Sequence, residues 1–328
     1  WAPGTKASDF HTNNALDRYN FAPVNYLQQP ATRNNLYASG NFDITDNVSA
    51  YARVSYTQRR SSQQLAQVPT TLSTSGGNGP QWAFGYDAMN IFNPVTPTPA
   101  QCGQAGPVLV PGCTTTALTY LRNVAVGPRH NDYVFNTLAS TVGLQGSFQL
   151  GDRNFDWEVY GQYNTADSTK TGLNYINLFN LKAGMGASFA DAGGLHCGVY
   201  DPTKPGNGAI QGCTPVDLFN GPGMGLGNKY RRSDDPTKFY QVTAQDVANM
   251  ISYIGYTEVA ITGTRGINYG ATLSGEILPL QGGMLSFAAG VEQRRASAKF
   301  TPDALVAGGG SSDNFTTPTK GETKVNEW

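Results

Sequence analysis

Two long runs in which apolar and polar residues alternate constrain this chain more than any other feature. They lie together in residues 34–59, NNLYASGNFDITDNVSAYARVSYTQR, and are joined by Thr45-Asp46-Asn47. Alternation with a period of two predicts β-strands with one apolar and one polar face. Each run has about 10 residues or more, whereas a typical globular strand has about 5 or 6. The apolar registers are Leu36, Ala38, Gly40, Phe42 and Ile44 in the first run, and Val48, Ala50, Ala52, Val54 and Tyr56 in the second.

The same hairpin pattern occurs twice more, at about 132–169 and about 257–299. Its turns are expected at Gly151–Asn154 and Pro279–Gly283, and a further strand begins near Glu322. The sequence therefore predicts an all-β, antiparallel fold.

The connections between these strands alternate in length. Within hairpins they span roughly three to five residues, but between hairpins the loops run over about 60–131, 170–256 and 300–321. Compact domains rarely contain connections of this length. Short turns at one end and long loops at the other are typical of a transmembrane β-barrel of the outer membrane.

The long loops contain two candidate helices. In 243–254, Thr243 can serve as the N-cap, with Asp246 three residues on. The apolar residues of this segment recur on one helical face. The second candidate helix covers 114–123.

Composition excludes several classes of function. The chain has 22 Lys and Arg against 23 Asp and Glu, so it lacks the positive charge that general nucleic-acid binding requires. Charged residues make up 14% of the chain, against roughly 25% in ordinary soluble chains. No run of about 18 apolar residues occurs, so no transmembrane helix is expected.

The four cysteines fall in two close pairs, Cys102 with Cys113 and Cys197 with Cys213. Each pair lies in a segment rich in Gly and Pro, outside the alternating runs. Small loops closed by neighbouring cysteines favour disulfides and an oxidising compartment. A metal site is the alternative, but these spacings match no zinc signature. We expect neither a metal nor another cofactor.

Aromatic residues gather toward the ends of the expected strands. The two interfacial girdles of a transmembrane barrel would produce this pattern, although aromatics are common in strands generally. Arg265 interrupts the apolar register of the third hairpin, so part of that strand is expected to lie above any lipid. Near the short turns lie Phe42, Phe148, Phe155, Trp157 and Phe287, and nearer the long loops lie Tyr56, Tyr163 and Tyr269.

No catalytic constellation stands out. The three histidines are His11, His130 and His196, and the chain contains neither a nucleophile elbow nor an HExxH motif. The segment Gly221–Lys229, GPGMGLGNK, lacks the strand–loop–helix context and the GK[ST] ending of a phosphate-binding loop. We therefore expect no enzymatic activity.

A resemblance to a known family rests on Arg18–Pro30, RYNFAPVNYLQQP, followed by NLYASGNFDITDNVSAYARVSYTQR. These residues resemble the barrel of TonB-dependent receptors of Gram-negative proteobacteria. The resemblance implies a barrel of about 22 strands with a plugged lumen. The whole chain, residues 1–328, is then a middle part of one barrel domain, with six strands and the start of a seventh. The plug domain, the TonB box and the C-terminal strands would lie outside it, so both ends are expected to be cuts.

The resemblance implies active import of a scarce nutrient across the outer membrane, such as a glycan or oligosaccharide, a siderophore or a similar compound. The expected partners are outer-membrane lipid, this substrate, and the TonB–ExbB–ExbD complex acting through the plug domain. The long loops would be extracellular. The alternatives are an outer-membrane enzyme and a structural or adhesive β-rich surface protein of the autotransporter kind. The adhesive protein demands a fixed repeat period, which the irregular spacing lacks.

Two groups of residues are candidates for contact with the substrate. Polar residues of the lumen-facing register could line its path, although any water-filled barrel needs a polar lumen. Aromatic and basic residues of the long loops could stack on a sugar or an aromatic chelate, or could instead form small cores within the loops. The path candidates are Tyr51, Arg53, Arg59, Glu158, Tyr160, Glu276 and Glu292, and the loop candidates are Trp82, Tyr86, Tyr175, Tyr230, Arg232 and Tyr240.

Overall fold

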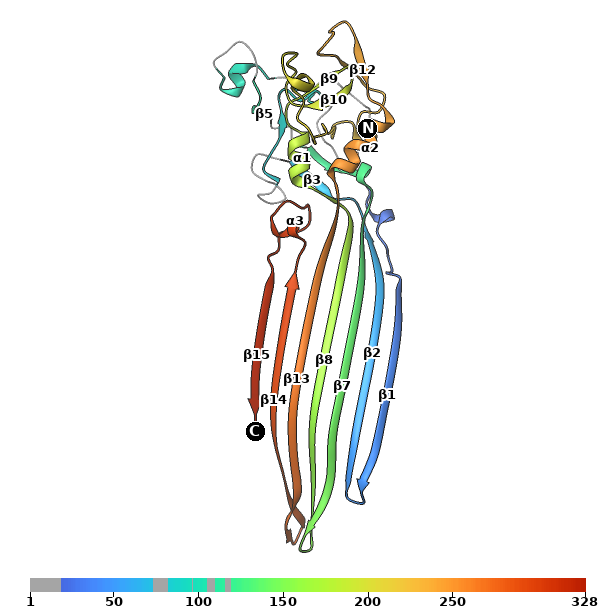
Figure 1. Ribbon diagram of the computed structural model, residues 1–328, viewed down its shortest axis with the longest axis vertical. Helices are drawn as coiled ribbons and strands as arrows, with labels where there is room; N and C mark the ends of the chain where they lie inside the picture. The colour runs from blue at the N-terminus through green and yellow to red at the C-terminus, as the bar shows by residue number, and fades with distance from the viewer. Residues whose placement is uncertain (1–18, 73–81, 96, 105–109, 116–118) are drawn as a thin grey trace.

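One antiparallel sheet of seven long strands dominates the computed structural model, which describes residues 19–72, 82–95, 97–104, 110–115 and 119–328. The spatial order of these strands follows their order in the chain (Figure 1). The all-β, antiparallel fold expected from the sequence is confirmed. The strands are β1 (Ala31–Thr45), β2 (Val48–Leu65), β7 (Arg129–Leu150), β8 (Arg153–Ile176), β13 (Gly255–Leu280), β14 (Gly283–Thr301) and β15 (Thr319–Glu327).

The three hairpins close through tight turns at one end of the sheet, here called the turn end. The turns consist of Asp46–Asn47, Gly151–Asp152 and Gln281–Gly282. Gly151 has a φ of 64°, a left-handed conformation that a residue without a Cβ adopts readily. Each turn is shorter than expected because strand pairing continues to the residues on either side of it.

The strands also extend further toward the long loops than the alternating pattern predicts. β13 has 26 residues, whereas about 9 to 11 residues suffice for a tilted strand to cross a bilayer. The three loops are correspondingly shorter than expected, and span 66–128, 177–254 and 302–318. We call this end of the sheet the loop end.

Register assigns each strand residue to one of two faces, because directly paired residues share a face. Pairing joins Tyr51, Gly143, Tyr160, Gly270 and Glu292 in one row across five strands. We call the face that carries this row the polar face. The opposite, apolar face carries the alternating apolar registers of the sequence.

The first and second long loops fold together at the loop end (Figure 1), and we call their folded part the loop domain. Four small two-stranded sheets are described in it, β3 (Pro69–Leu72) with β6 (Thr119–Arg122), β4 (Tyr86–Asp87) with β5 (Thr114–Thr115), β9 (Ser188–Asp191) with β10 (Gly194–Cys197), and β11 (Lys229–Arg231) with β12 (Phe239–Gln241). The helices are α1 (Leu178–Gly184) and α2 (Ala244–Ile254) in the loop domain and α3 (Ala304–Ala307) in the third loop. Short 3-10 turns occur at Ala22–Val24, Pro99–Cys102, Val124–Val126, Pro205–Gly208 and Gly221–Gly223.

One of the two predicted helices is present. In α2 the Thr243 hydroxyl accepts from Asp246 N at 3.1 Å, and the Asp246 carboxylate accepts from Thr243 N at 2.8 Å, so the capping box is complete. The helix predicted at 114–123 is wrong, because this segment contributes β5 and β6. Its threonines favour extended backbone, and both strands gain partners in β4 and β3.

The two loops share one hydrophobic core and are joined by hydrogen bonds. The Tyr86 hydroxyl of the first loop donates to Val216 O at 2.8 Å and accepts from Leu218 N at 2.8 Å. Asp87 N donates to Met185 O at 2.9 Å. The largest fully buried side chains are Trp82, Tyr86, Phe92, Ile176, Leu181, Met185, Val216, Leu218, Met224, Met250 and Ile254.

Candidate functional site

The register places all seven predicted path residues on the polar face, but in separate groups. Tyr51, Arg53, Glu158 and Tyr160 come together at the centre of the face. Glu276 lies near the turn end, where it accepts from a backbone N–H at 3.1 Å. Glu292 on β14 lies beside this central group, in the row of Tyr51 and Tyr160, and Arg59 lies toward the loop end of β2.

At the centre, tyrosine rings cover glycines on neighbouring strands. A Cβ built on Gly143 would lie 2.5 Å from the Tyr51 ring, and one built on Gly270 would lie 2.5 Å from the Tyr160 ring. Only glycine leaves room for these rings to lie against the adjacent strand. Tyr51 is consequently only 7% exposed, so most of its ring belongs to the wall.

Charged groups of both signs surround the Tyr51 ring. Its hydroxyl donates to Glu158 Oε1 at 2.5 Å, and the Arg53 guanidinium carbon lies 5.1 Å from the ring centroid. A carboxylate, a guanidinium and two phenols within one patch can hydrogen-bond a polar ligand. The same groups would equally suit the wall of a water-filled lumen.

A second cationic group, toward the loop end, includes an arginine that sequence reasoning missed. Arg59 lies directly opposite Arg33 of β1, and its guanidinium carbon is 5.9 Å from the Phe135 ring centroid. Like charges directly opposite each other in a sheet are destabilising. The pair could have been found by extending the polar register of β1 to the residues before position 34.

The polar face has two shallow depressions with different linings. One of about 480 Å³, near the turn end, is bordered by Asp43, Asp156 and Glu158. The other, of about 700 Å³, lies nearer the loops and is lined by small residues such as Ala166 and Ala298. The polar face is therefore acidic at the turn end and nearly uncharged in the larger depression.

Four of the six predicted loop-binding residues are buried in the core. Trp82, Tyr86, Tyr175 and Tyr230 expose 2, 1, 3 and 7% of their surfaces. This corrects the prediction that they offer a stacking surface. The alternative that loop aromatics form small cores applies to these four, because the loops fold over one another.

The other two loop candidates are partly exposed but serve local structure. Arg232 forms an ion pair with Asp234. The Tyr240 hydroxyl donates to Asp246 Oδ2 at 2.8 Å and so reinforces the start of α2.

A buried carboxyl group, Asp217, orders the turn that follows Val216. Its Oδ1 accepts from Phe219 N at 2.9 Å and Asn220 N at 3.1 Å, and its Oδ2 accepts from Asn220 Nδ2 at 2.6 Å. Burial raises the pKa of Asp217 to about 6, against the opposing effect of these hydrogen bonds. No sequence pattern indicated this group.

A partly buried cluster of three ionisable side chains ties the third loop to the sheet. Lys170 Nζ on β8 lies 2.8 Å from Glu258 Oε1 on β13 and 2.8 Å from Asp313 Oδ2 in the loop. Burial, together with the hydrogen bond to Asp313, raises the pKa of Glu258 to about 7. Burial alone would raise the pKa of Asp313 too, but hydrogen bonds to Glu258 and Lys170 lower it. These residues are too far apart in sequence for any local pattern to reveal the cluster.

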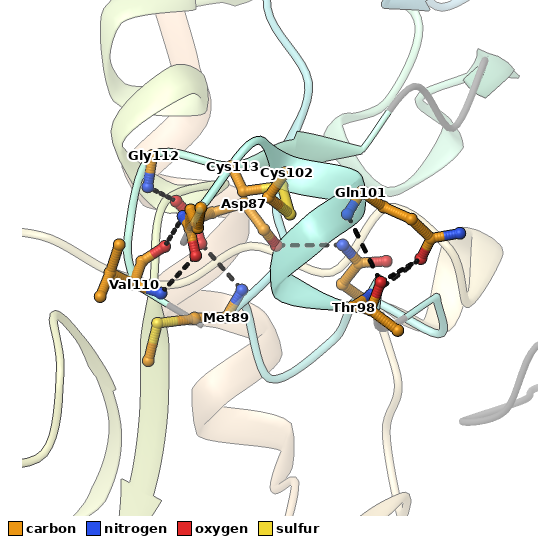
Figure 2. The surroundings of a disulfide bond; sticks show 10 residues. Asp87, Met89, Thr98, Gln101, Cys102, Val110, Gly112 and Cys113 are labelled. Carbon is orange, nitrogen blue, oxygen red and sulfur yellow. Dashed lines mark hydrogen bonds between the residues drawn. A yellow bond between two sulfur atoms is a disulfide. The ribbon is translucent and has the colours of Figure 1, made fainter. Parts of the chain in front are cut away.

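Both expected disulfides, Cys102–Cys113 and Cys197–Cys213, are present in the loop domain. Figure 2 shows the first beside Asp87, whose carboxylate accepts from Gly112 N at 2.6 Å. The second lies against the core, since Cys197 is 1% exposed. Among the residues that the structure describes, no three His, Cys, Asp or Glu side chains gather as metal ligands would.

Aromatic side chains on the apolar face form two lines. Near the turn end, the Phe148 and Phe155 rings stack with centroids 5.1 Å apart, and Phe287 lies 6.2 Å from Phe155. The other line consists of three tyrosines nearer the loop end. From β2 to β8 to β13, each tyrosine lies one row of this face closer to the turn end than the previous one. They are Tyr56 on β2, Tyr163 on β8 and Tyr269 on β13.

The geometry thus defines an amphipathic antiparallel sheet with a folded loop domain at one end. No protein-family model matches this sequence, and no curated protein matches it. Within the described residues, no helix has the length and apolar character needed to cross a membrane.

Two solved structures that this chain resembles weakly are receptors from Acinetobacter baumannii. One is the siderophore receptor PiuA, 11% identical with a TM-score of 0.35, covering 91% of this chain and 29% of that chain. The other is BauA, the ferric preacinetobactin receptor, 12% identical with a TM-score of 0.34, covering 93% of this chain and 29% of that chain. This chain therefore spans 29% of the length of each receptor. A likeness this low does not define a family and adds nothing to what the geometry indicates about function.

Proposed function

We propose that residues 1–328 are part of the barrel domain of a TonB-dependent outer-membrane receptor that imports a scarce nutrient. The observation that carries the proposal is the apolar face bounded by two aromatic lines, opposite a continuous polar face. Along β8 these lines are marked by Phe155 and Tyr163, about nine residues inclusive, which matches the roughly 9 to 11 residues of a membrane-crossing strand. Aromatic girdles at both interfaces are characteristic of transmembrane barrels.

The slant of the tyrosine line supports a barrel. Barrel strands tilt by about 35–45° from the membrane normal, so a membrane plane crosses neighbouring strands at different rows. Tyr56, Tyr163 and Tyr269 step toward the turn end from β2 to β13 as such a tilt requires.

The unpaired edges of the sheet also support this proposal. β1 and β15 are the edge strands, and unpaired backbone groups in lipid cost several kcal/mol each. Further strands that close the barrel would satisfy these groups. The seven described strands are about a third of the roughly 22 in barrels with a plugged lumen.

In this arrangement the loop domain faces outward and the turn end faces the periplasm. Tyr51, Arg53, Glu158 and Tyr160 line the substrate path or contact the plug domain. The TonB–ExbB–ExbD complex supplies energy through that plug, outside this chain. The role of the chain is transport of a small-molecule or oligomeric nutrient, without chemical conversion.

The test is uptake in the native bacterium. A strain lacking the gene, and a strain lacking TonB, are compared with the parent for accumulation of labelled oligosaccharides and ferric siderophores. We expect both mutant strains to lose uptake of the same substrate class. We also expect the protein to fractionate with outer membranes. Recovery of the protein outside the outer-membrane fraction would refute the proposal.

A further inference from the structure

Basic side chains gather on the apolar face where the apolar register of β13 and β14 ends. They lie on three adjacent strands, in three consecutive rows of that face. The row of Arg265 contains Ser297 and Glu322, and the rows on either side hold the other basic residues. We call the five of them the basic patch, Arg265, Arg295, Lys299, Lys320 and Lys324.

The patch contains two pairs of like charges that face each other directly. Arg295 is paired with Lys324, and Lys299 is paired with Lys320. Like charges at directly opposite positions destabilise a sheet. Within these three rows of the face, the five cations stand against two carboxylates, Glu322 in the patch and Asp167 beside it, so the local charge is positive.

The five basic side chains are exposed, and none forms an ion pair with another described residue. Arg294, the neighbour of Arg295 in sequence, points to the polar face and pairs with Glu292 and Glu327. Glu292 and Glu327 are therefore engaged on the other side of the sheet. An anion from outside the chain would relieve the repulsion between the opposed cations.

The position of the patch indicates what kind of anion this is. Toward the turn end, Ile267 lies one row from Arg265 on β13, and Val291 lies two rows from Arg295 on β14. Rows on one face are about 7 Å apart, so apolar surface begins within about 7–14 Å of the cations. A ligand that covers both surfaces has anionic groups joined to long apolar chains.

The patch is local to one part of the sheet. On the other strands, the row of Lys299 and Lys320 continues through Asp167, Asn136, Gln58 and Asn34, which include no cation. The basic residue closest to that row on β2 is Arg60, one row higher. Within the three rows of the patch, the cations therefore lie only on β13, β14 and β15.

We propose that the basic patch binds the phosphate groups of an acylated lipid in the membrane leaflet nearer the loops, with the acyl chains against the adjoining apolar rows. This inference rests on the proposed function, because it requires the apolar face to lie in a bilayer. Lysine and arginine stems can lie along apolar surface while their charged ends remain at the interface. Guanidinium groups bind phosphate oxygens in bidentate fashion, and ammonium groups attract them as point charges.

The test measures lipid binding by the purified, folded receptor that contains this chain. The probe is lipid A, a bisphosphorylated, acylated disaccharide, titrated in detergent and followed by native mass spectrometry. The variant is Arg295→Gln/Lys299→Gln/Lys324→Gln, and the matched control is Arg60→Gln on the same face of β2. We expect the triple variant to bind lipid A at least about tenfold more weakly, and the control to bind as the parent does.

Two further arms separate possible outcomes. Inorganic phosphate should not displace lipid A at equal concentration, and zwitterionic phosphatidylcholine should bind the variant and the parent alike. Equal lipid A binding by variant and parent, or displacement by free phosphate, would overturn the inference. If the receptor fractionates with outer membranes but the triple variant keeps its lipid, the inference alone fails; if it does not fractionate there, the proposed function fails.

Discussion

Tyr160 on β8 lies against Gly270 on β13, with its ring 2.5 Å from the position that a Cβ on Gly270 would occupy. In the same row, Tyr51 on β2 lies in the same way against Gly143 on β7. Both rings therefore cover the neighbouring strand of the seven-stranded sheet, β7 under Tyr51 and β13 under Tyr160. This relationship gives the polar face a fixed wall at its centre, from which Arg53 and Glu158 extend.

We predict that Gly270→Ala destabilises the folded protein by about 1–3 kcal/mol, because the new methyl group forces the Tyr160 ring away from β13. The measurement is urea unfolding of the reconstituted protein. Gly40→Ala on β1 is the control, since no atom lies within 4 Å of the position that its Cβ would occupy, and it should leave the midpoint unchanged or raise it slightly. Equal midpoints for the two variants would contradict the close packing of Tyr160.

We predict that Lys170→Met releases the third loop, because it leaves Glu258 and Asp313 without their shared cation. Removing one partner of a fully buried ion pair costs about 3–5 kcal/mol, and the partial exposure of Lys170 and Asp313 makes the expected cost smaller here. Hydrogen exchange of residues 302–318 should become much faster, while exchange in β7 changes little. Lys182→Met, an exposed lysine in α1, is the control. Unchanged protection of the loop in Lys170→Met would show that the cluster does not hold it.

The same cluster predicts a pH dependence of loop attachment. The pKa of Glu258 is raised from 4.5 to about 7 in the folded protein, so its contribution to stability is present below pH 4.5 and is lost as pH rises through 7. The pKa of Asp313 is lowered, so its contribution is lost as pH falls below 3.8. Protection of residues 302–318 against hydrogen exchange should therefore be greatest between pH 3.8 and 4.5, where both carboxyl groups contribute, and weaker at pH 8. Glu258→Gln should remove the loss at pH 8, and a profile identical to that of the parent would argue against this assignment.

We predict that the two disulfides contribute unequally to the loop domain. Closing a loop of about 15 residues stabilises a protein by about 3 kcal/mol in the chain-entropy description. Cys197 is buried against the core, whereas Cys102 and Cys113 are partly exposed. Replacing Cys197 and Cys213 by alanine should therefore make the segment 177–254 more sensitive to protease than replacing Cys102 and Cys113 does for the segment 66–128. The reverse order would contradict the burial argument.

The sheet could be predicted from the sequence because its cause is local. Alternation along one strand determines which residues share a face, and Thr243 with Asp246 determines where α2 begins. The strand segments above the apolar rows were missed, since they are held by pairing between distant strands and carry no apolar alternation. For the same reason Arg33 was not included among the candidate site residues.

The loop domain could not be predicted because its contacts are between loops. Trp82 and Tyr230 lie in long loops, where an aromatic residue could equally be exposed for binding or buried. Their burial is evident only once the two loops are folded together. The cluster of Lys170, Glu258 and Asp313 likewise depends on a loop returning to the sheet. Tertiary contacts of this kind leave no periodic signal in the sequence.

The most direct test of the central claim is a nitroxide scan along β8, one position at a time from 155 to 169, with the protein in lipid vesicles. In a membrane-embedded strand, labels at odd positions from 155 to 163 should be accessible to oxygen and protected from a water-soluble nickel complex. Labels at the even positions between them should show nickel access, and beyond Thr165 both faces should be accessible to nickel. Nickel access at every position, without alternation, would contradict a lipid-facing sheet.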